Sequence, residues 1–174
     1  IGCEEALRER VGLRKGKSLA SIDTVLADRI TYMPGGKVLV STMRANGGYA
    51  ALVSGGFTVF TEPVAAHLGF DEHRSNTFEV EGDVLTGRVV PPIFGREAKV
   101  QALEEITAHL GLTDADVLAV GDGANDLGML TRAGTGVALH AKPAVQAEVT
   151  IRVNHCDLTA LLFVQGYGTE EWRE

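Results

Sequence analysis

The chain has 174 residues, of which 45% are apolar and 22% are charged, and its formal net charge is −7. This length and composition are typical of one globular domain with a substantial buried core. An acidic chain makes a poor surface for nucleic acid, and no apolar run reaches the length that spans a membrane. Cys3 and Cys156 lie far apart without metal-ligand spacing, so we expect two free thiols in a reducing cytosol.

Apolar periodicity predicts helices and short strands that alternate along the chain. We expect a first helix over residues 3–15, with Leu7, Arg10 and Val11 on its inner side. The next predicted elements are helices over residues 18–30 and 37–45, a strand over residues 49–53 and a helix over residues 58–68.

A β-hairpin is expected next, in which residues 76–80 pair with residues 85–90 across Glu81-Gly-Asp83. The later predicted elements are helices over residues 96–110, 124–132 and 158–164, a brief helix from Pro143, and strands over residues 117–120, 134–139 and 149–153. Strands that alternate with helices imply an α/β fold with a doubly wound parallel sheet. The hairpin, at about residues 75–92, would be a small flap inserted between two such units.

The segment Val120-Gly-Asp-Gly-Ala-Asn-Asp126 follows a predicted buried strand and precedes a predicted helix. Ligands of open α/β sheets bind at the carboxyl edge of the strands, where this turn would lie. Asp122, Asn125 and Asp126 bring three oxygen-bearing side chains into one turn, a set that suits a hard cation such as Mg²⁺. The alternative is a tight turn with an Asx cap on the next helix.

Ser54 and two glycines follow another apolar run, and a helical pattern comes after them. A Ser hydroxyl together with backbone N–H groups at the start of a helix makes an anion site. Ser54 is therefore a candidate phosphate ligand. The alternative is a Ser N-cap with glycines that allow close packing.

Lys99 lies on the same predicted helical stripe as Leu103, Ile106 and Leu110. A lysine that points toward a core must either snorkel to the surface or meet negative charge. Near the first turn of a helix a cation gains nothing from the helix dipole. A phosphate or a carboxylate would explain this lysine, and snorkelling is the alternative.

In this order, a Ser-Gly-Gly strand end, a helix-borne lysine and a Gly-Asp-Gly-x-Asn-Asp loop resemble motifs two to four of the haloacid dehalogenase-like hydrolases. Within that superfamily the chain is most similar to the phosphoserine phosphatase family. The segments that carry this closer similarity are Glu4-Glu-Ala-Leu-Arg-Glu-Arg-Val11, Val53-Ser-Gly-Gly-Phe-Thr58, Leu85-Thr-Gly-Arg-Val89 and Ala141-Lys-Pro143.

The resemblance implies a cytoplasmic, Mg²⁺-dependent phosphomonoester hydrolase of serine biosynthesis, which converts O-phospho-L-serine to L-serine through an aspartyl-phosphate. It implies that Ser54 and the Gly55 N–H hold phosphate oxygens, and that Lys99 neutralises the phosphate and the nucleophile. Asp122 would bind the metal, with Asp126 in the surrounding shell.

Two further roles follow from the resemblance. Asn125 would contact substrate or phosphate, and Arg10 would pair bidentately with the substrate carboxylate, which a planar guanidinium suits. For Arg10 the alternative is a solvated place on a charged helix face.

One departure from the family is the absence of its first motif, Asp-x-Asp-x-Thr, which carries the nucleophilic aspartate. The chain also starts at Ile1, so we expect a longer parent enzyme whose nucleophile lies upstream. By resemblance, residues 1–32 are the rear part of a helical cap, and residues 33–174 are the phosphatase core without its first strand. That strand would lie between the strands ending at Ser54 and Gly121, so we expect residues 1–174 alone to be unstable and inactive.

Two other functional hypotheses remain open. One is a sister phosphatase that acts on another small phosphate ester. The other is a non-catalytic phosphate-binding fragment. None of the three hypotheses calls for a nucleic-acid or membrane partner.

Overall fold

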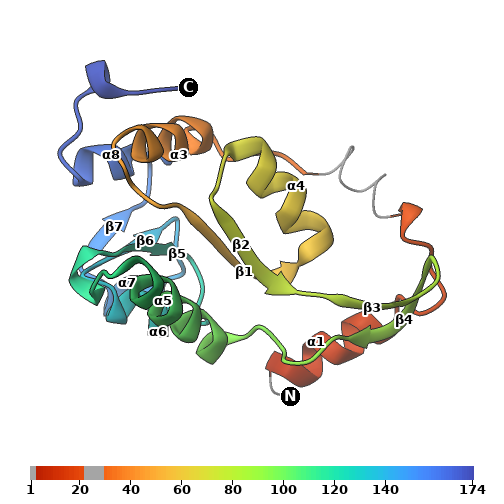
Figure 1. Ribbon diagram of the computed structural model, residues 1–174. Helices are drawn as coiled ribbons and strands as arrows, with labels where there is room; N and C mark the ends of the chain where they lie inside the picture. The colour runs from red at the N-terminus through yellow and green to blue at the C-terminus, as the bar shows by residue number, and fades with distance from the viewer. Residues whose placement is uncertain (1–2, 22–29) are drawn as a thin grey trace. The chain divides into compact units, whose positions relative to one another are not determined.

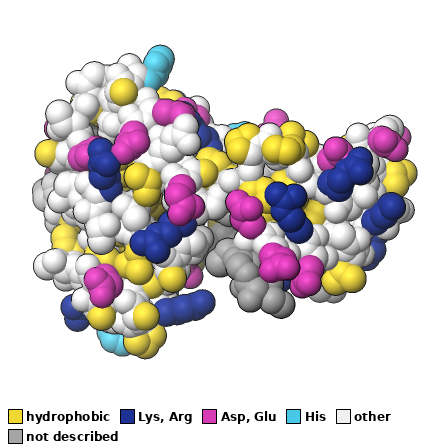
Figure 2. Space-filling view, turned by 90° about the horizontal axis from the view of Figure 1, so that it is seen from below, with side chains coloured by type: hydrophobic (Ala, Val, Ile, Leu, Met, Phe, Trp, Pro, Cys, Tyr) yellow, Lys and Arg dark blue, Asp and Glu magenta, His cyan; other side chains and the backbone are white. Residues whose placement is uncertain are grey.

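The computed structural model describes residues 3–21 and 30–174 of the chain. They form two compact units, of which one comprises Ile1–Phe94 with Thr169–Glu174 and the other comprises Gly95–Gly168. The α/β class is confirmed, because each unit combines parallel strands with helices (Figure 1). In the described ranges no helix is long and apolar enough to cross a membrane. Acidic and basic side chains are interspersed over the face seen in Figure 2, which gives that face no single-sign field.

In the first unit, helix α1 (Cys3–Gly12) packs against a β-hairpin formed by β3 (Phe78–Glu81) and β4 (Val84–Val89). The predicted hairpin is confirmed, with Glu81 paired to Val84. Its buried core consists of Val11, Phe78, Leu85 and Val89. The expectation that Arg10 lies on the inner side of this helix was wrong: its side chain is exposed, because Leu7 and Val11 fill the contact with the hairpin.

Helix α1 ends at Gly12, three residues before the predicted end at residue 15. The N–H of Gly16 donates to the carbonyl of Leu85 at 2.9 Å, and Ser18 forms an antiparallel bridge with Val84. The start of the helix predicted over residues 18–30 is therefore partly extended. Residues 22–29 of that prediction lie outside the described residues.

The same unit contains a two-stranded parallel sheet of β1 (Ala51–Phe57) and β2 (Glu72–Asn76). Helix α4 (Thr58–Leu68) connects the two strands and packs on both, and α3 (Gly36–Ala45) packs on α4 (Figure 1). Strand β2 was missed, because its sequence Glu-His-Arg-Ser-Asn contains no apolar residue that would reveal an alternating pattern. A short 3₁₀ turn, η2 (Thr169–Glu171), ends this unit.

The second unit is built on a three-stranded parallel sheet in the order β5-β6-β7. Its strands are β5 (Leu118–Gly121), β6 (Thr135–Leu139) and β7 (Ile151–Val153). Its helices are α5 (Arg96–Leu110), the 3₁₀ turn η1 (Asp114–Asp116), α6 (Leu127–Arg132), α7 (Pro143–Glu148) and α8 (Ala160–Val164).

Helix α5 begins and ends where the sequence predicts, because Gly95 and Gly111 bracket it. Its buried side differs from the predicted stripe: Leu110 is 37% exposed, whereas Lys99, Ala102, Leu103 and Thr107 are buried. Helix α6 begins three residues later than predicted, because residues 122–126 form the turn that follows β5.

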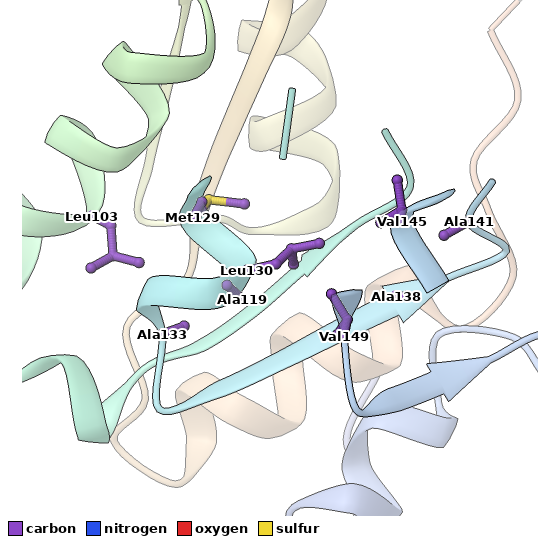
Figure 3. Packing of buried hydrophobic residues seen from close by; sticks show 9 residues of the cluster. All are labelled: Leu103, Ala119, Met129, Leu130, Ala133, Ala138, Ala141, Val145 and Val149. Atoms are coloured by element: carbon purple, nitrogen blue, oxygen red, sulfur yellow. The ribbon is translucent and has the colours of Figure 1, made fainter. Parts of the chain in front are cut away.

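One apolar cluster holds α5, α6 and α7 on the sheet of the second unit (Figure 3). Its buried members are Leu103, Ala119, Met129, Leu130, Ala133, Ala138, Ala141, Val145 and Val149. Protein interiors pack at crystal-like density and do not deform freely. The cluster therefore gives Lys99 on α5 and the turn after β5 a fixed common base.

Both parallel sheets have an open edge. Within residues 3–21 and 30–174, β1 pairs only with β2, and β5 pairs only with β6. An edge strand presents N–H and C=O groups without partners, to which another strand can pair. Each sheet can therefore accept a further strand at this edge.

Candidate active site

The Ser-Gly-Gly segment forms a bulge in β1. On β1 the paired residues step from Val53 to Phe57, while on β2 they step only from Arg74 to Asn76. The hydroxyl of Ser54 accepts a hydrogen bond from the N–H of Gly56 at 3.0 Å. Bulges interrupt the ladder and re-aim side chains, often beside active sites.

The position expected for Ser54 at the start of a helix was wrong. Helix α4 begins at Thr58, and Phe57 precedes it without a side-chain cap. The alternative of a Ser N-cap is wrong for the same reason. The helix predicted over residues 58–68 is confirmed as α4, and the two extra residues of the bulge lie between Ser54 and its start.

Asn76 supports this bulge, and sequence reasoning missed it. The side chain is 1% exposed, and its amide nitrogen donates to the carbonyl of Gly55 at 3.0 Å and to that of Phe94 at 3.2 Å. Its amide oxygen accepts from the N–H of Phe94 at 2.7 Å. A buried amide with this many bonds fixes the peptide after Gly55. The sequence placed Asn76 at the start of the predicted hairpin strand, whereas it is the last residue of β2, and no pattern marked it as a buried polar residue.

In the second unit, Lys99 meets negative charge, so the snorkelling alternative is wrong. Its Nζ lies 2.6 Å from Oδ1 of Asp126, and both residues are 5% exposed. The other carboxylate oxygen of Asp126 accepts the N–H of Asp122 at 3.2 Å and of Gly123 at 3.0 Å. Every oxygen of this buried carboxylate is therefore bonded.

Asp126 precedes α6, yet it makes no side-chain cap on that helix. Its carboxylate turns back to the N–H groups of the loop, so the Asx-cap alternative is wrong. Glycine is required at Gly121, where a Cβ would lie 2.5 Å from Cβ of Asp126. A Cβ at Gly123 would collide with the amide oxygen of Asn125.

Asp122 follows the carboxyl end of β5 and has an exposed side chain, as does Asn125. Asp122 is the one acidic side chain of the turn whose carboxylate is available to a cation, because the oxygens of Asp126 are occupied. No group of three or more His, Cys, Asp or Glu residues able to hold a metal occurs among the described residues. Mg²⁺ commonly takes one or two carboxylates and completes its shell with water and substrate phosphate. The residues fit such an ion and do not fit a cage made by protein alone.

Arg10 lines a pocket of about 300 Å³ in the first unit, together with Leu13, Arg14 and Lys17. Three of these four side chains are cations, and no ion pair joins them to a described residue. A guanidinium in this position is available to an anion. The candidate residues thus fall into two groups: Arg10, Ser54 and Gly55 in the first unit, and Lys99, Asp122, Asn125 and Asp126 in the second.

The family model described as haloacid dehalogenase-like hydrolase matches residues 2–131. A phosphoserine phosphatase from Polaromonas sp. (strain JS666) is 42% identical over 163 residues, which cover 91% of this chain and 69% of the relative. A phosphoserine phosphatase from Haemophilus influenzae is 40% identical over 159 residues, which cover 91% of this chain and 50% of the relative. The crystal structure of a probable phosphoserine phosphatase from Vibrio cholerae superimposes with a TM-score of 0.91 at 34% identity, over 95% of this chain and 51% of that one. The chain belongs to the haloacid dehalogenase-like hydrolase family.

Proposed function

We propose that this chain forms the phosphate- and metal-binding part of a phosphoserine phosphatase, which hydrolyses O-phospho-L-serine to L-serine. The observation that carries the proposal is the buried Lys99–Asp126 pair beside Asp122, at the carboxyl end of β5. The names of the relatives from Polaromonas and Haemophilus support the same substrate.

Lys99 is the residue that meets the transferred phosphoryl group. An ammonium has three N–H donors, and among the described residues one of them is used, by Asp126. The remaining donors are available to a phosphoryl oxygen. Phosphoryl transfer relies on charge stabilisation and positioning, which a fixed lysine supplies.

The charge of this pair also explains the need for a metal. The charges of Lys99 and Asp126 sum to zero, whereas a phosphomonoester carries close to two negative charges near neutral pH. Further positive charge must therefore come from elsewhere. A Mg²⁺ ion, held in part by Asp122, supplies that charge as a Lewis acid when it is bound. Asp126 acts indirectly, by fixing the loop through the N–H groups of Asp122 and Gly123.

The bulge of β1 provides the second set of phosphate contacts. Ser54 already accepts a hydrogen bond from Gly56, so its own hydroxyl hydrogen is left to donate to a phosphoryl oxygen. Asn76 fixes the carbonyl of Gly55 and so supports the bulge, in which the N–H of Gly55 is the second donor. Asn125 contacts the substrate or its phosphate.

Arg10 binds the substrate carboxylate. Its exposure and its place in a cation-lined pocket support this role. A planar guanidinium forms two parallel hydrogen bonds with a carboxylate. This contact distinguishes phosphoserine from esters that lack a carboxylate.

The nucleophilic aspartate belongs to a segment upstream of Ile1, and the reaction takes place in the cytoplasm. Two observations support the first point: the chain contains no Asp-x-Asp-x-Thr sequence, and β1 and β5 each have an edge without a partner among the described residues.

The test is a steady-state assay of the full-length protein with phosphoserine and with an aryl phosphate. We expect phosphoserine hydrolysis that a chelator abolishes and added Mg²⁺ restores. Hydrolysis of the aryl phosphate alone would favour the sister phosphatase. Phosphate binding without turnover of either ester would favour the non-catalytic protein.

A further inference from the structure

His140 has an unusual backbone conformation at the carboxyl end of β6. Its φ is 47°, and every other described residue with a positive φ is a glycine. A non-glycine residue in the left-handed region costs conformational free energy, and it persists only where its surroundings enforce it. Such residues cluster at functional sites. What holds His140 in place is therefore informative.

Two hydrogen bonds tie His140 to the end of β7 and to the loop that follows it. Its backbone N–H donates to the carbonyl of Val153 at 2.8 Å. Its Nε2 lies 2.7 Å from the carbonyl oxygen of Cys156. Because a carbonyl oxygen only accepts, Nε2 carries the hydrogen and the imidazole is the donor.

Burial and hydrogen bonds also fix the two residues after His140. Ala141 is buried in the apolar cluster, and its carbonyl accepts from the side chain of Gln146 at 2.6 Å. The N–H of Lys142 then donates to the backbone carbonyl of Asp122 at 3.2 Å. The turn after β6 thus connects His140 directly to the loop that carries the proposed metal ligand.

We propose that His140 is a positioning residue: its imidazole, fixed by the Cys156 carbonyl, locks the turn so that the Lys142 N–H holds the main chain of Asp122. The proposal rests on the proposed function for the role of Asp122. It assigns the imidazole a purpose that a glycine, which adopts this φ freely, would not serve.

Matched variants separate the imidazole from the backbone. His140→Gly removes the imidazole and relieves the backbone cost, and His140→Ala removes the imidazole and keeps that cost. His155→Ala is the control, since His155 is exposed, lies in the same loop as Cys156 and makes no hydrogen bond to a described residue. Thermal melts of all three full-length variants establish that they fold.

The direct readout is amide hydrogen exchange at Lys142, which does not depend on activity. We expect its protection to fall about tenfold or more in both His140 variants, because local opening governs exchange. The Mg²⁺ dissociation constant, measured by calorimetry, should rise about 10- to 100-fold, the usual effect of losing a residue that orients a metal ligand. The control should match the wild type in both measurements.

Unchanged protection of Lys142 in His140→Gly overturns the proposal. Lost protection with an unchanged Mg²⁺ constant overturns the link between this turn and the metal ligand. If the wild-type protein neither binds Mg²⁺ nor hydrolyses phosphoserine, the proposed function fails, while the exchange measurement still decides whether His140 holds the loop.

Discussion

In the proposed mechanism the Lys99–Asp126 pair combines a structural and a chemical role in two side chains. Both are 5% exposed, so both charges have lost most of their hydration. A buried pair adds little to stability by itself, but removal of one partner leaves an uncompensated charge. Its presence beside Asp122 is therefore better explained by function than by stability.

Replacement of Lys99 by methionine separates these two roles. Lys99→Met should lower the free energy of unfolding by about 3–5 kcal/mol, because Asp126 is left as an unpaired buried charge. Turnover should fall by about 100-fold or more, the scale of losing one fixed electrostatic group. In the double variant Lys99→Met/Asp126→Asn, the amide still accepts from the loop N–H groups, so stability should largely return. Denaturant titration gives the free energy of unfolding, and a steady-state assay gives kcat. Near-normal turnover of the double variant would show that Lys99 has no chemical role.

Arg10 is expected to set substrate specificity. Arg10→Ala should reduce kcat/KM for phosphoserine. The loss should correspond to about 2–5 kcal/mol of transition-state binding, the cost of leaving a substrate carboxylate without its charged partner. An aryl phosphate, which lacks the carboxylate, should be affected far less. Arg14→Ala is the control, because Arg14 lines the same pocket. Equal losses on both substrates would show that Arg10 is structural.

The turn between β5 and α6 depends on glycine. A Cβ at Gly121 would lie within 2.8 Å of three side-chain atoms of Asp126. Gly121→Ala should therefore destabilise the protein by about 1–3 kcal/mol, the usual cost of overpacking. Gly12→Ala is the control, because nothing lies within 4 Å of the added atom. If denaturation shows no difference between the two variants, the packing described for this turn is wrong.

The hairpin carries a pH-sensitive contact. The hydroxyl of Thr86, and next Arg88, donate to the carboxylate of Glu79, and these bonds lower the pKa of Glu79. A carboxyl whose pKa is lower in the folded state stabilises the fold above its unfolded pKa, and this contribution is lost as the pH falls through the folded pKa. Thr86→Val should raise the pKa of Glu79, as an NMR titration of its carboxyl carbon would measure. An unchanged titration curve would show that the hydroxyl contributes nothing.

Elements that glycines bracket or that show apolar periodicity could be predicted from the sequence. Elements held by polar partners distant in the sequence could not. Gly95 and Gly111 bracket α5, so its bounds could be read from the sequence. The position of Lys99 on a buried stripe predicted a negative partner, but its identity as Asp126 depends on how α5 packs against α6. The bulge at Ser54 arises from its register with β2, a strand without apolar residues.

For the molecule as a whole, the proposed mechanism concerns the edges of β1 and β5 that have no partner among the described residues. In the proposed function the described chain supplies a metal ligand, a fixed lysine and a bulge that suits phosphate. In the proposed mechanism the atom that attacks phosphorus comes from the upstream segment. Residues 1–174 and the longer parent should therefore differ in chemistry.

Trapping of the phosphorylated intermediate shows which segment supplies the nucleophile. The parent protein and residues 1–174 are each mixed with Mg²⁺ and phosphoserine that carries a labelled phosphate, and the reaction is quenched in acid. Peptide mapping then locates the labelled residue. We expect a labelled aspartate upstream of Ile1 in the parent and no label on residues 1–174, which should also lack the turnover and the cooperative melt of a stable monomer. A label on any residue between Ile1 and Glu174, or normal turnover by residues 1–174 alone, would contradict this expectation.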